Sequence, residues 1–190
     1  MYASVVPLGI EGSYEKAIEA LDNAEKYHPK SPLIPLTRAR VEIAKQDFDT
    51  SEVYLKEALS RKSNYTEALF IMAQIEALRG DMDSAIQRSE AVASLTPNDP
   101  SVFFQLGFMH YSNRDYAQAI PVLQRAIQLS PVYSNAKYFL GLSFYKIGRM
   151  DKTLELFLEI EELNPENSEV KNIIKNLRDG KEPFADFSLL

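Results

Sequence analysis

The sequence predicts an all-α solenoid of antiparallel helix pairs, with about 10 helices. Prolines at positions 97, 131 and 165 are equally spaced, and Pro29 precedes Pro97 by twice the same interval. Each proline closes an amphipathic stretch, such as LQRAIQLSP before position 131. A repeat of about this length holds two helices whose apolar faces are buried only by stacking neighbouring units, so the period favours a solenoid.

The apolar positions predict one unpaired helix, then four helix pairs, then a last single helix. A proline ends the second helix of each pair because it lacks the amide that would continue the helix. Small residues such as Ala85, Gly107 and Gly141 let the two helices of a pair approach closely. We expect helices at 13–27, 32–45/48–61, 66–79/82–95, 100–113/116–129, 134–147/150–163 and 168–178.

These helices define one solenoid domain over residues 13–178, between an irregular segment (1–12) and a C-terminal tail (179–190). Pro7 and Gly9 interrupt the helix that would pair with the first one. Two explanations stay open: the chain is the C-terminal piece of a longer protein, or it begins with a ragged cap. The expected units are a half repeat (13–31), repeats 32–65, 66–99, 100–133 and 134–167, and a capping helix (168–178).

The recurring residues resemble the tetratricopeptide repeat (TPR), whose characteristic period the spacing of the prolines matches. The first repeat departs from the pattern, with Ser51 and Ser63 in place of the usual alanine and proline. The resemblance covers about residues 11–180 and implies a right-handed superhelix with a concave groove. The matching residues are Phe103, Leu106, Gly107, Tyr116, Ala119, Leu123, Ala126 and Pro131 in the third repeat, and Leu140, Gly141, Phe144, Gly148, Phe157 and Pro165 in the fourth.

The C-terminal half resembles a more specific family. The stretches YSNAKYFLGLSFYKIGRMD and LNPENSEVKNIIKNLRDGKEP are similar to the C-terminal repeat domain of large multi-pass membrane proteins of candidate-phylum bacteria, some related to O-antigen ligases or polymerases. The resemblance covers only the repeats, so it implies a tethered scaffold and no catalytic residue for this chain.

The TPR resemblance also implies which residues face the groove, namely the second, fifth, ninth and twelfth places of each first helix. These residues are mostly aromatic and aliphatic, and aromatic clusters are typical interface anchors. The alternative is that several of them pack against adjacent helices. The candidate groove residues are Leu36, Arg40, Ile43, Phe70, Gln74, Ser101, Phe104, Phe108, Tyr111, Asn135, Tyr138, Leu142 and Tyr145.

This groove predicts a partner with apolar side chains, bound as an extended or helical segment. One variant of the family grips a terminal carboxylate with Lys and Asn, and this chain lacks those residues at the ninth places. Arg40, Gln74, Phe108 and Leu142 stand there instead. An acidic chaperone-type tail is therefore not the expected ligand.

Composition excludes several classes of partner and site. A net charge of −6 argues against nucleic acid, which requires a basic face. The absence of cysteine excludes disulfides and thiolate metal sites. No apolar run approaches the roughly 18 residues of a membrane span, so no direct membrane insertion is expected. We expect a soluble chain, cytoplasmic or tethered within a membrane protein.

Catalysis is not expected, and neither is a cofactor or a metal. His28 lies in a predicted turn, and His110 stands where the family usually packs a tyrosine. Neither histidine has metal-ligand spacing, and no glycine-rich phosphate loop is present. The carboxylates at 159–163 are interpreted as a solvated helix face.

The predicted function is a non-catalytic scaffold that binds a peptide in the aromatic groove. The alternative is a structural module that self-assembles or belongs to a larger membrane protein. The apolar tail KEPFADFSLL bears on this alternative, because Phe184 and Phe187 could cover the last helix or make a homodimer through a neighbour's groove. An unstructured tail is the other interpretation.

Overall fold

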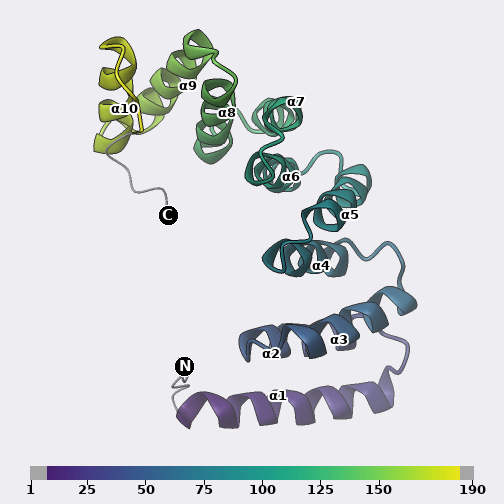
Figure 1. Cartoon of the computed structure of the whole chain (residues 1–190). Helices are drawn as coiled ribbons and strands as arrows, with labels where there is room; N and C mark the ends of the chain where they lie inside the picture. The colour runs from purple at the N-terminus through teal and green to yellow at the C-terminus, as the bar shows by residue number, and fades with distance from the viewer. Residues whose placement is uncertain (1–7, 185–190) are drawn as a thin grey trace. The chain divides into compact units, whose positions relative to one another are not determined.

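The computed structural model describes the backbone of residues 8–184 and the side chains of residues 13–184. All regular structure in this range is α-helical (Figure 1). The helices are α1 (Leu8–Tyr27), α2 (Leu33–Ala44), α3 (Phe48–Arg61), α4 (Thr66–Leu78), α5 (Met82–Leu95), α6 (Pro100–Ser112), α7 (Tyr116–Leu129), α8 (Ser134–Lys146), α9 (Met150–Leu163) and α10 (Ser168–Arg178).

Helices α2 to α10 begin and end within about one residue of the bounds expected from the sequence. The first helix differs, because α1 begins at Leu8 rather than at 13 and so extends into the predicted irregular segment 1–12. Pro7 and Gly9 were expected to interrupt a helix there, but an isolated glycine costs a helix only about 1 kcal/mol. Pro7 precedes the helix and breaks none of its hydrogen bonds. Residues 1–7 lie outside the described part of the chain.

The turn between the two helices of each pair has the same geometry in every repeat. Gln46, Gly80, Arg114 and Gly148 all have positive φ, between 63° and 83°. In each turn the next amide donates a hydrogen bond of 2.9 Å to the carbonyl five residues back, as Asp115 does to His110. This arrangement is the left-handed helix end that reverses the chain into the second helix.

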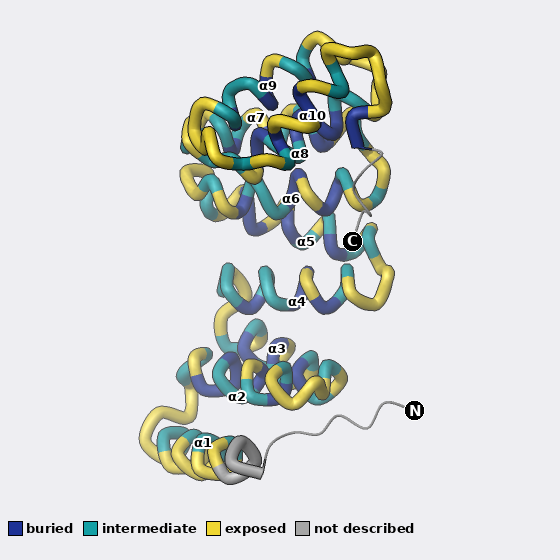
Figure 2. The backbone as a smooth tube through the Cα atoms, turned by 90° about the vertical axis from the view of Figure 1, so that its left-hand side faces the viewer, coloured by how far each residue is buried: buried dark blue, intermediate teal, exposed yellow. Residues whose placement is uncertain are grey.

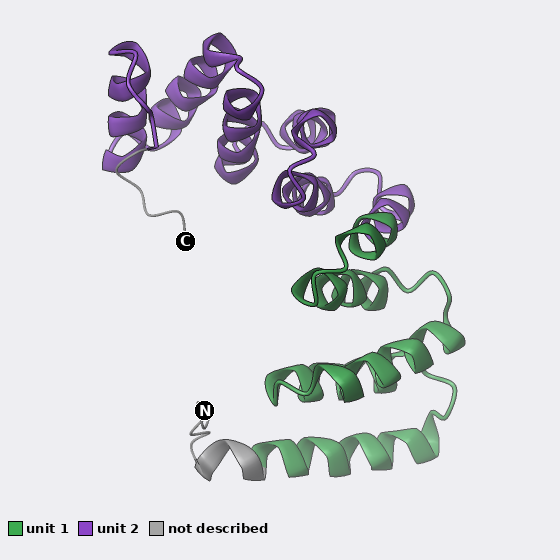
Figure 3. Ribbon diagram, viewed as in Figure 1, with its two compact units in different colours: residues 1–88 green, residues 89–190 purple. Residues whose placement is uncertain are grey.

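The structure divides into two compact units, residues 1–88 and 89–190, with the border inside α5 (Figure 3). The sequence predicted one continuous solenoid over 13–178. Repeats contact only their neighbours, so an array has no single central core, and compact units can be separated even within a repeat. Each unit is described below by itself.

The first unit has a core formed by α2, α3 and α4. Its fully buried residues include Leu36, Leu55 and Ala58, with Met72 packed against them. Arginines attach α1 to this core: Arg61 on α3 pairs with Glu25 on α1 and donates to the Ser31 carbonyl at 2.8 Å. These contacts tie α1 to the following pair.

The second unit has two connected clusters, in which buried and exposed positions alternate along each helix (Figure 2). Leu123 on α7 and Phe157 on α9 are fully buried opposite two glycines. A methyl group added to Gly107 would lie 2.6 Å from the Leu123 Cγ, and one added to Gly141 would lie 2.8 Å from the Phe157 Cε2. The glycines therefore set the close spacing of the pairs α6–α7 and α8–α9.

Candidate functional site

The first unit places its predicted groove residues in different environments. Ile43 and Phe70 are half-buried, whereas Arg40 and Gln74 are exposed. Arg40 forms an ion pair with Glu67 at the start of α4. The prediction that Leu36 faces a groove is wrong, because its side chain is 0% exposed within the cluster of Leu55 and Met72.

The second unit gathers aromatic side chains from α6 and α8 into one continuous set. Phe139 is its centre, with ring centroids 4.8 Å from Phe108, 5.3 Å from Tyr111 and 5.7 Å from Tyr138. The Phe108 and Tyr138 contacts are edge-on, the geometry that aromatic pairs prefer. We call this set the aromatic face; its members are Phe104, Phe108, Tyr111, Tyr133, Tyr138 and Phe139.

The aromatic face remains partly open to solvent. Phe108 is 39% exposed, and the other five members are half-buried. Phe104 stacks on Phe108 at 6.3 Å and lies 5.1 Å from Tyr133, so the exposed ring is held by its neighbours. A preformed, half-exposed aromatic surface suits an apolar ligand because little side-chain entropy remains to be lost.

Two residues of the aromatic face, Phe139 and Tyr133, were missing from the sequence prediction. Counting only four places of each first helix passed over Phe139, which directly follows Tyr138. Tyr133 lies just before α8. Its counterpart one period earlier is Asp99, but Tyr65 precedes α4 in the same way. This recurrence of tyrosine before a first helix was the available signal.

The polar candidates Ser101 and Asn135 are exposed at the start of α6 and α8. Ser101 donates from its hydroxyl to the Asp99 carboxylate at 2.6 Å, and its amide donates to the same side chain at 2.9 Å. Ser101 thus belongs to the cap of α6, where such a hydrogen bond satisfies a free amide.

The far end of α8 differs from the prediction at Leu142. This residue is 3% exposed and is not part of an open groove. It packs in a cluster with Ile173 and Ile174 of α10 and with Phe184 of the tail. Residues 182–184 cover this end, because Glu182 and Phe184 both contact Tyr145 of α8.

Two tyrosine hydroxyls on α8 are bound by carboxylates. Tyr138 donates to Glu169 at 3.0 Å, and Tyr145 donates to Glu182. Burial, followed by the hydrogen bond to Glu182, raises the pKa of Tyr145 to about 12. The same two causes, with Glu169 as the partner, raise the pKa of Tyr138 well above its usual range. Both groups are therefore neutral hydrogen-bond donors at physiological pH.

The histidines lie in environments that match the sequence interpretation. His110 is 8% exposed within α6, and its Nδ1 has no hydrogen-bond partner. Burial lowers its pKa from 6.5. His28 is exposed in the turn after α1. Among residues 8–184, no three His, Asp or Glu side chains are grouped so that they could hold a metal ion.

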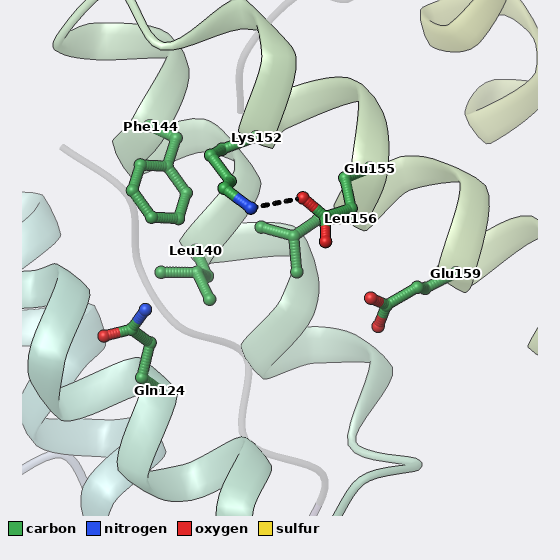
Figure 4. A pocket seen from close by; sticks show the side chains of 7 residues that line it. All are labelled: Gln124, Leu140, Phe144, Lys152, Glu155, Leu156 and Glu159. Carbon is green, nitrogen blue, oxygen red and sulfur yellow. Dashed lines mark hydrogen bonds and ion pairs between the residues drawn. The ribbon is translucent and has the colours of Figure 1, made fainter.

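A small pocket of about 160 Å³ lies among α7, α8 and α9, away from the aromatic face (Figure 4). Lys152 and Glu155 form an ion pair of 2.6 Å at its edge. A cavity of this size lies below the roughly 300 Å³ at which ligand sites usually begin. Its lining consists of Gln124, Leu140, Phe144, Lys152, Glu155, Leu156 and Glu159, and includes no predicted groove residue.

Comparison with known families agrees with this architecture. The tetratricopeptide repeat model matches residues 109–168, and the coatomer epsilon subunit model matches residues 11–105, which is half of the chain. The chain is therefore a tetratricopeptide-repeat protein, and over residues 11–105 it belongs to the coatomer epsilon subunit family. None of the helices in the described range has the length and apolar character needed to cross a membrane.

Among curated relatives, the BBSome complex member BBS4 of Bos taurus is 23% identical over 70% of this chain and 26% of its own length. The chain spans about a quarter or less of the first relatives it matches. Among solved structures, MamA is 26% identical, with a TM-score of 0.72 over 78% of this chain and 81% of its own. YrrB, a TPR protein with an unusual peptide-binding site, is 17% identical, with a TM-score of 0.72 over 86% of both chains.

Proposed function

We propose that this chain is a non-catalytic scaffold that binds a peptide or protein segment with apolar side chains on its aromatic face. The observation that carries the proposal is Phe108, a ring left 39% exposed and held edge-on at 4.8 Å from Phe139. Exposed aromatic rings in a well-packed surrounding are typical centres of interfaces.

The chemistry of the face limits its ligand. The phenylalanine and tyrosine rings on α6 and at the start of α8 offer edges and faces to apolar side chains. The tyrosine hydroxyls of Tyr138 and Tyr145 are already bound by carboxylates. An acidic terminal carboxylate finds no lysine in the face, so an apolar internal segment fits better than a charged terminus.

The test is a random-peptide display selection on the purified chain, followed by affinity measurement on single variants. Phe108→Ala is expected to weaken the selected peptides at least about tenfold, as the loss of a central aromatic anchor usually does. Leu163→Ala, which shortens an exposed side chain at the end of α9, is the matched control and should leave affinity unchanged. Equal binding by both variants would reject the aromatic face as the binding surface.

A second candidate function is a structural module within a larger assembly. It is supported by the names of the relatives, which include members of the BBSome complex and subunits of the anaphase-promoting complex. The tether to a membrane protein that the C-terminal sequence resemblance implies belongs to this proposal, as does self-association. A mass that rises with concentration in sedimentation, unaffected by Phe108→Ala, would favour it over peptide binding.

A further inference from the structure

The chain between Asp179 and Phe184 turns back onto the end of the second unit. Gly180, with φ of 66°, ends α10, and the Lys181 amide donates to the Asn176 carbonyl at 2.9 Å. This left-handed helix end reverses the chain direction. Residues 181–184 follow, with a turn at 183–184, and contact Tyr145 of α8.

Three consecutive residues, Glu182 to Phe184, hold this turn against the second unit. Pro183 is fully buried and Phe184 is 8% exposed. The Phe184 ring lies edge-on to Tyr145 at 5.0 Å and tilted against Phe157 at 5.9 Å. Glu182 stays exposed, yet its carboxylate accepts the hydrogen bond of the Tyr145 hydroxyl. The segment thus supplies one acceptor, one rigid residue and one aromatic anchor.

The side chains that surround Phe184, here called its pocket, adjoin the aromatic face. Tyr111 and Tyr138, members of that face, pack against the same cluster as Phe184. The walls of the pocket, Leu142, Tyr145 and Phe157, belong to α8 and α9 rather than to the tail. The other buried members of the cluster, Ile160, Val170, Ile173 and Ile174, lie on α9 and α10 rather than on the tail.

We infer that this pocket is the specific subsite for a partner segment with an acidic residue, proline and an aromatic residue in succession, and that residues 182–184 are its built-in competitor. The inference rests on the proposed function and names the ligand chemistry at one end of the same surface. A tethered occupant acts at an effective concentration of about millimolar. A partner segment must therefore be present above that concentration, or gain affinity by binding the aromatic face as well.

The alternative is a purely structural cap. Position 184 lies one repeat period after Met150, the first residue of α9, so Phe184 stands where the second helix of a further repeat would begin. A structural cap predicts that emptying the pocket only destabilises the protein, whereas a subsite predicts that the emptied pocket binds the same sequence from outside.

The experiment uses the full chain and a labelled synthetic peptide with the sequence of residues 181–190. The peptide should bind the Phe184→Ala chain at least tenfold more tightly than the unaltered chain. Binding should be lost when the peptide's own phenylalanine at 184 is replaced by alanine, or when Tyr145→Ala is added to the chain. A folded Phe184→Ala chain with no affinity for the peptide overturns the inference.

A second measurement tests the inference on the unaltered chain, in case the Phe184→Ala variant does not fold. The unaltered chain carries 4-fluorophenylalanine at position 184, and millimolar peptide is added. The fluorine signal should move from its buried to its free position, and a signal that stays unchanged overturns the inference. A dimer of the unaltered chain that the peptide dissociates also overturns it, because the occupant would then be a second copy.

The outcome separates the subsite from the proposed function. Display-selected peptides that depend on Phe108 but bind equally to Tyr145→Ala would keep the scaffold function and reject the subsite. Peptides that depend on neither residue would reject both.

Discussion

Gly107 and Gly141 show how single residues set the spacing of the helix pairs. Alanine usually stabilises a helix by about 1 kcal/mol relative to glycine. Here the added methyl of Gly107→Ala would lie 2.6 Å from the Leu123 Cγ and 3.3 Å from its backbone nitrogen, so α7 itself must move. Overpacking of this kind costs about 1–3 kcal/mol and outweighs the gain in helix propensity.

We therefore expect Gly107→Ala and Gly141→Ala each to lower the free energy of unfolding by about 1–2 kcal/mol. Chemical denaturation followed by circular dichroism measures this. Gln128→Ala, an exposed substitution on α7, is the control and should change stability by less than about 0.5 kcal/mol. A stabilised Gly107→Ala variant would show that the pair can separate without cost.

His110 predicts a pH dependence of stability. Burial lowers its pKa in the folded chain below the ordinary value of 6.5, and attraction to Asp115 and Glu90 only partly opposes this. The unfolded chain therefore takes up the proton first as the pH falls. Stability is fully present above about pH 6.5 and is lost as the pH falls toward the folded pKa.

The expected result is a larger drop in melting temperature between pH 7.5 and pH 5.5 for the unaltered chain than for His110→Gln. His28→Gln is the control, because His28 is exposed and should leave the pH dependence unchanged. If His110→Gln retained the full pH dependence, other groups would be responsible.

At the residue scale, periodicity predicted the helices better than it predicted exposure. Leu36 and Arg40 share one face of α2, yet Leu36 is fully buried and Arg40 is exposed. A repeat position specifies direction, whereas burial depends on which neighbour covers it. Phe139 is the opposite case. It is the centre of the aromatic face because it contacts Phe108 and Tyr111 of α6, and the sequence of α8 alone does not reveal those contacts.

At the scale of elements, the turns between paired helices require a left-handed backbone conformation, and only two of the four turns have glycine at that position. Gln46 and Arg114 occupy the left-handed conformation that Gly80 and Gly148 occupy in the other repeats. This conformation costs a residue with a side chain roughly 1–2 kcal/mol. Glycine avoids that cost, although it loses roughly 0.5–1 kcal/mol more backbone entropy on folding.

Gln46→Gly and Arg114→Gly should consequently raise the free energy of unfolding by about 0.5–1 kcal/mol each. Thermal and chemical denaturation provide the measurement. The reverse substitution, Gly80→Ala, is the matched control and should destabilise, since a methyl there meets no neighbour and only the backbone conformation is changed. Destabilisation by Arg114→Gly would mean that the arginine side chain contributes more than the strain it causes.

The helices themselves were predictable because each pair carries its own signals. The turn positions recur at the repeat period, and the second helix of each pair begins at Phe48, Met82, Tyr116 or Met150. The start of α1 was not predictable in this way, because Pro7 and Gly9 indicated an interruption where the helix in fact begins. The turn of the tail depends on Tyr145 and Phe157, which lie far from it in sequence.

At the scale of the whole molecule, the two units have separate cores. Leu55 and Met72 belong to a cluster within the first unit, whereas Ile173 and Phe157 belong to one within the second. The repeat pattern runs through the border in α5 without a break, so no sequence signal indicates a division of the solenoid there. In an array, stability is the sum of local units and the interfaces between neighbours, so damage should stay local.

Leu55→Ala tests this locality. The side chain is fully buried, so its truncation should cost about 2–5 kcal/mol. Hydrogen exchange followed by mass spectrometry should show faster exchange in α2 to α4, while α9 and α10 keep the protection of the unaltered chain. Ile173→Ala should produce the opposite distribution, and Val53→Ala, at an exposed position on α3, should change neither. Equal acceleration in both units after either core substitution would show that the solenoid unfolds as one cooperative body, because loss of one core would then propagate through every repeat interface.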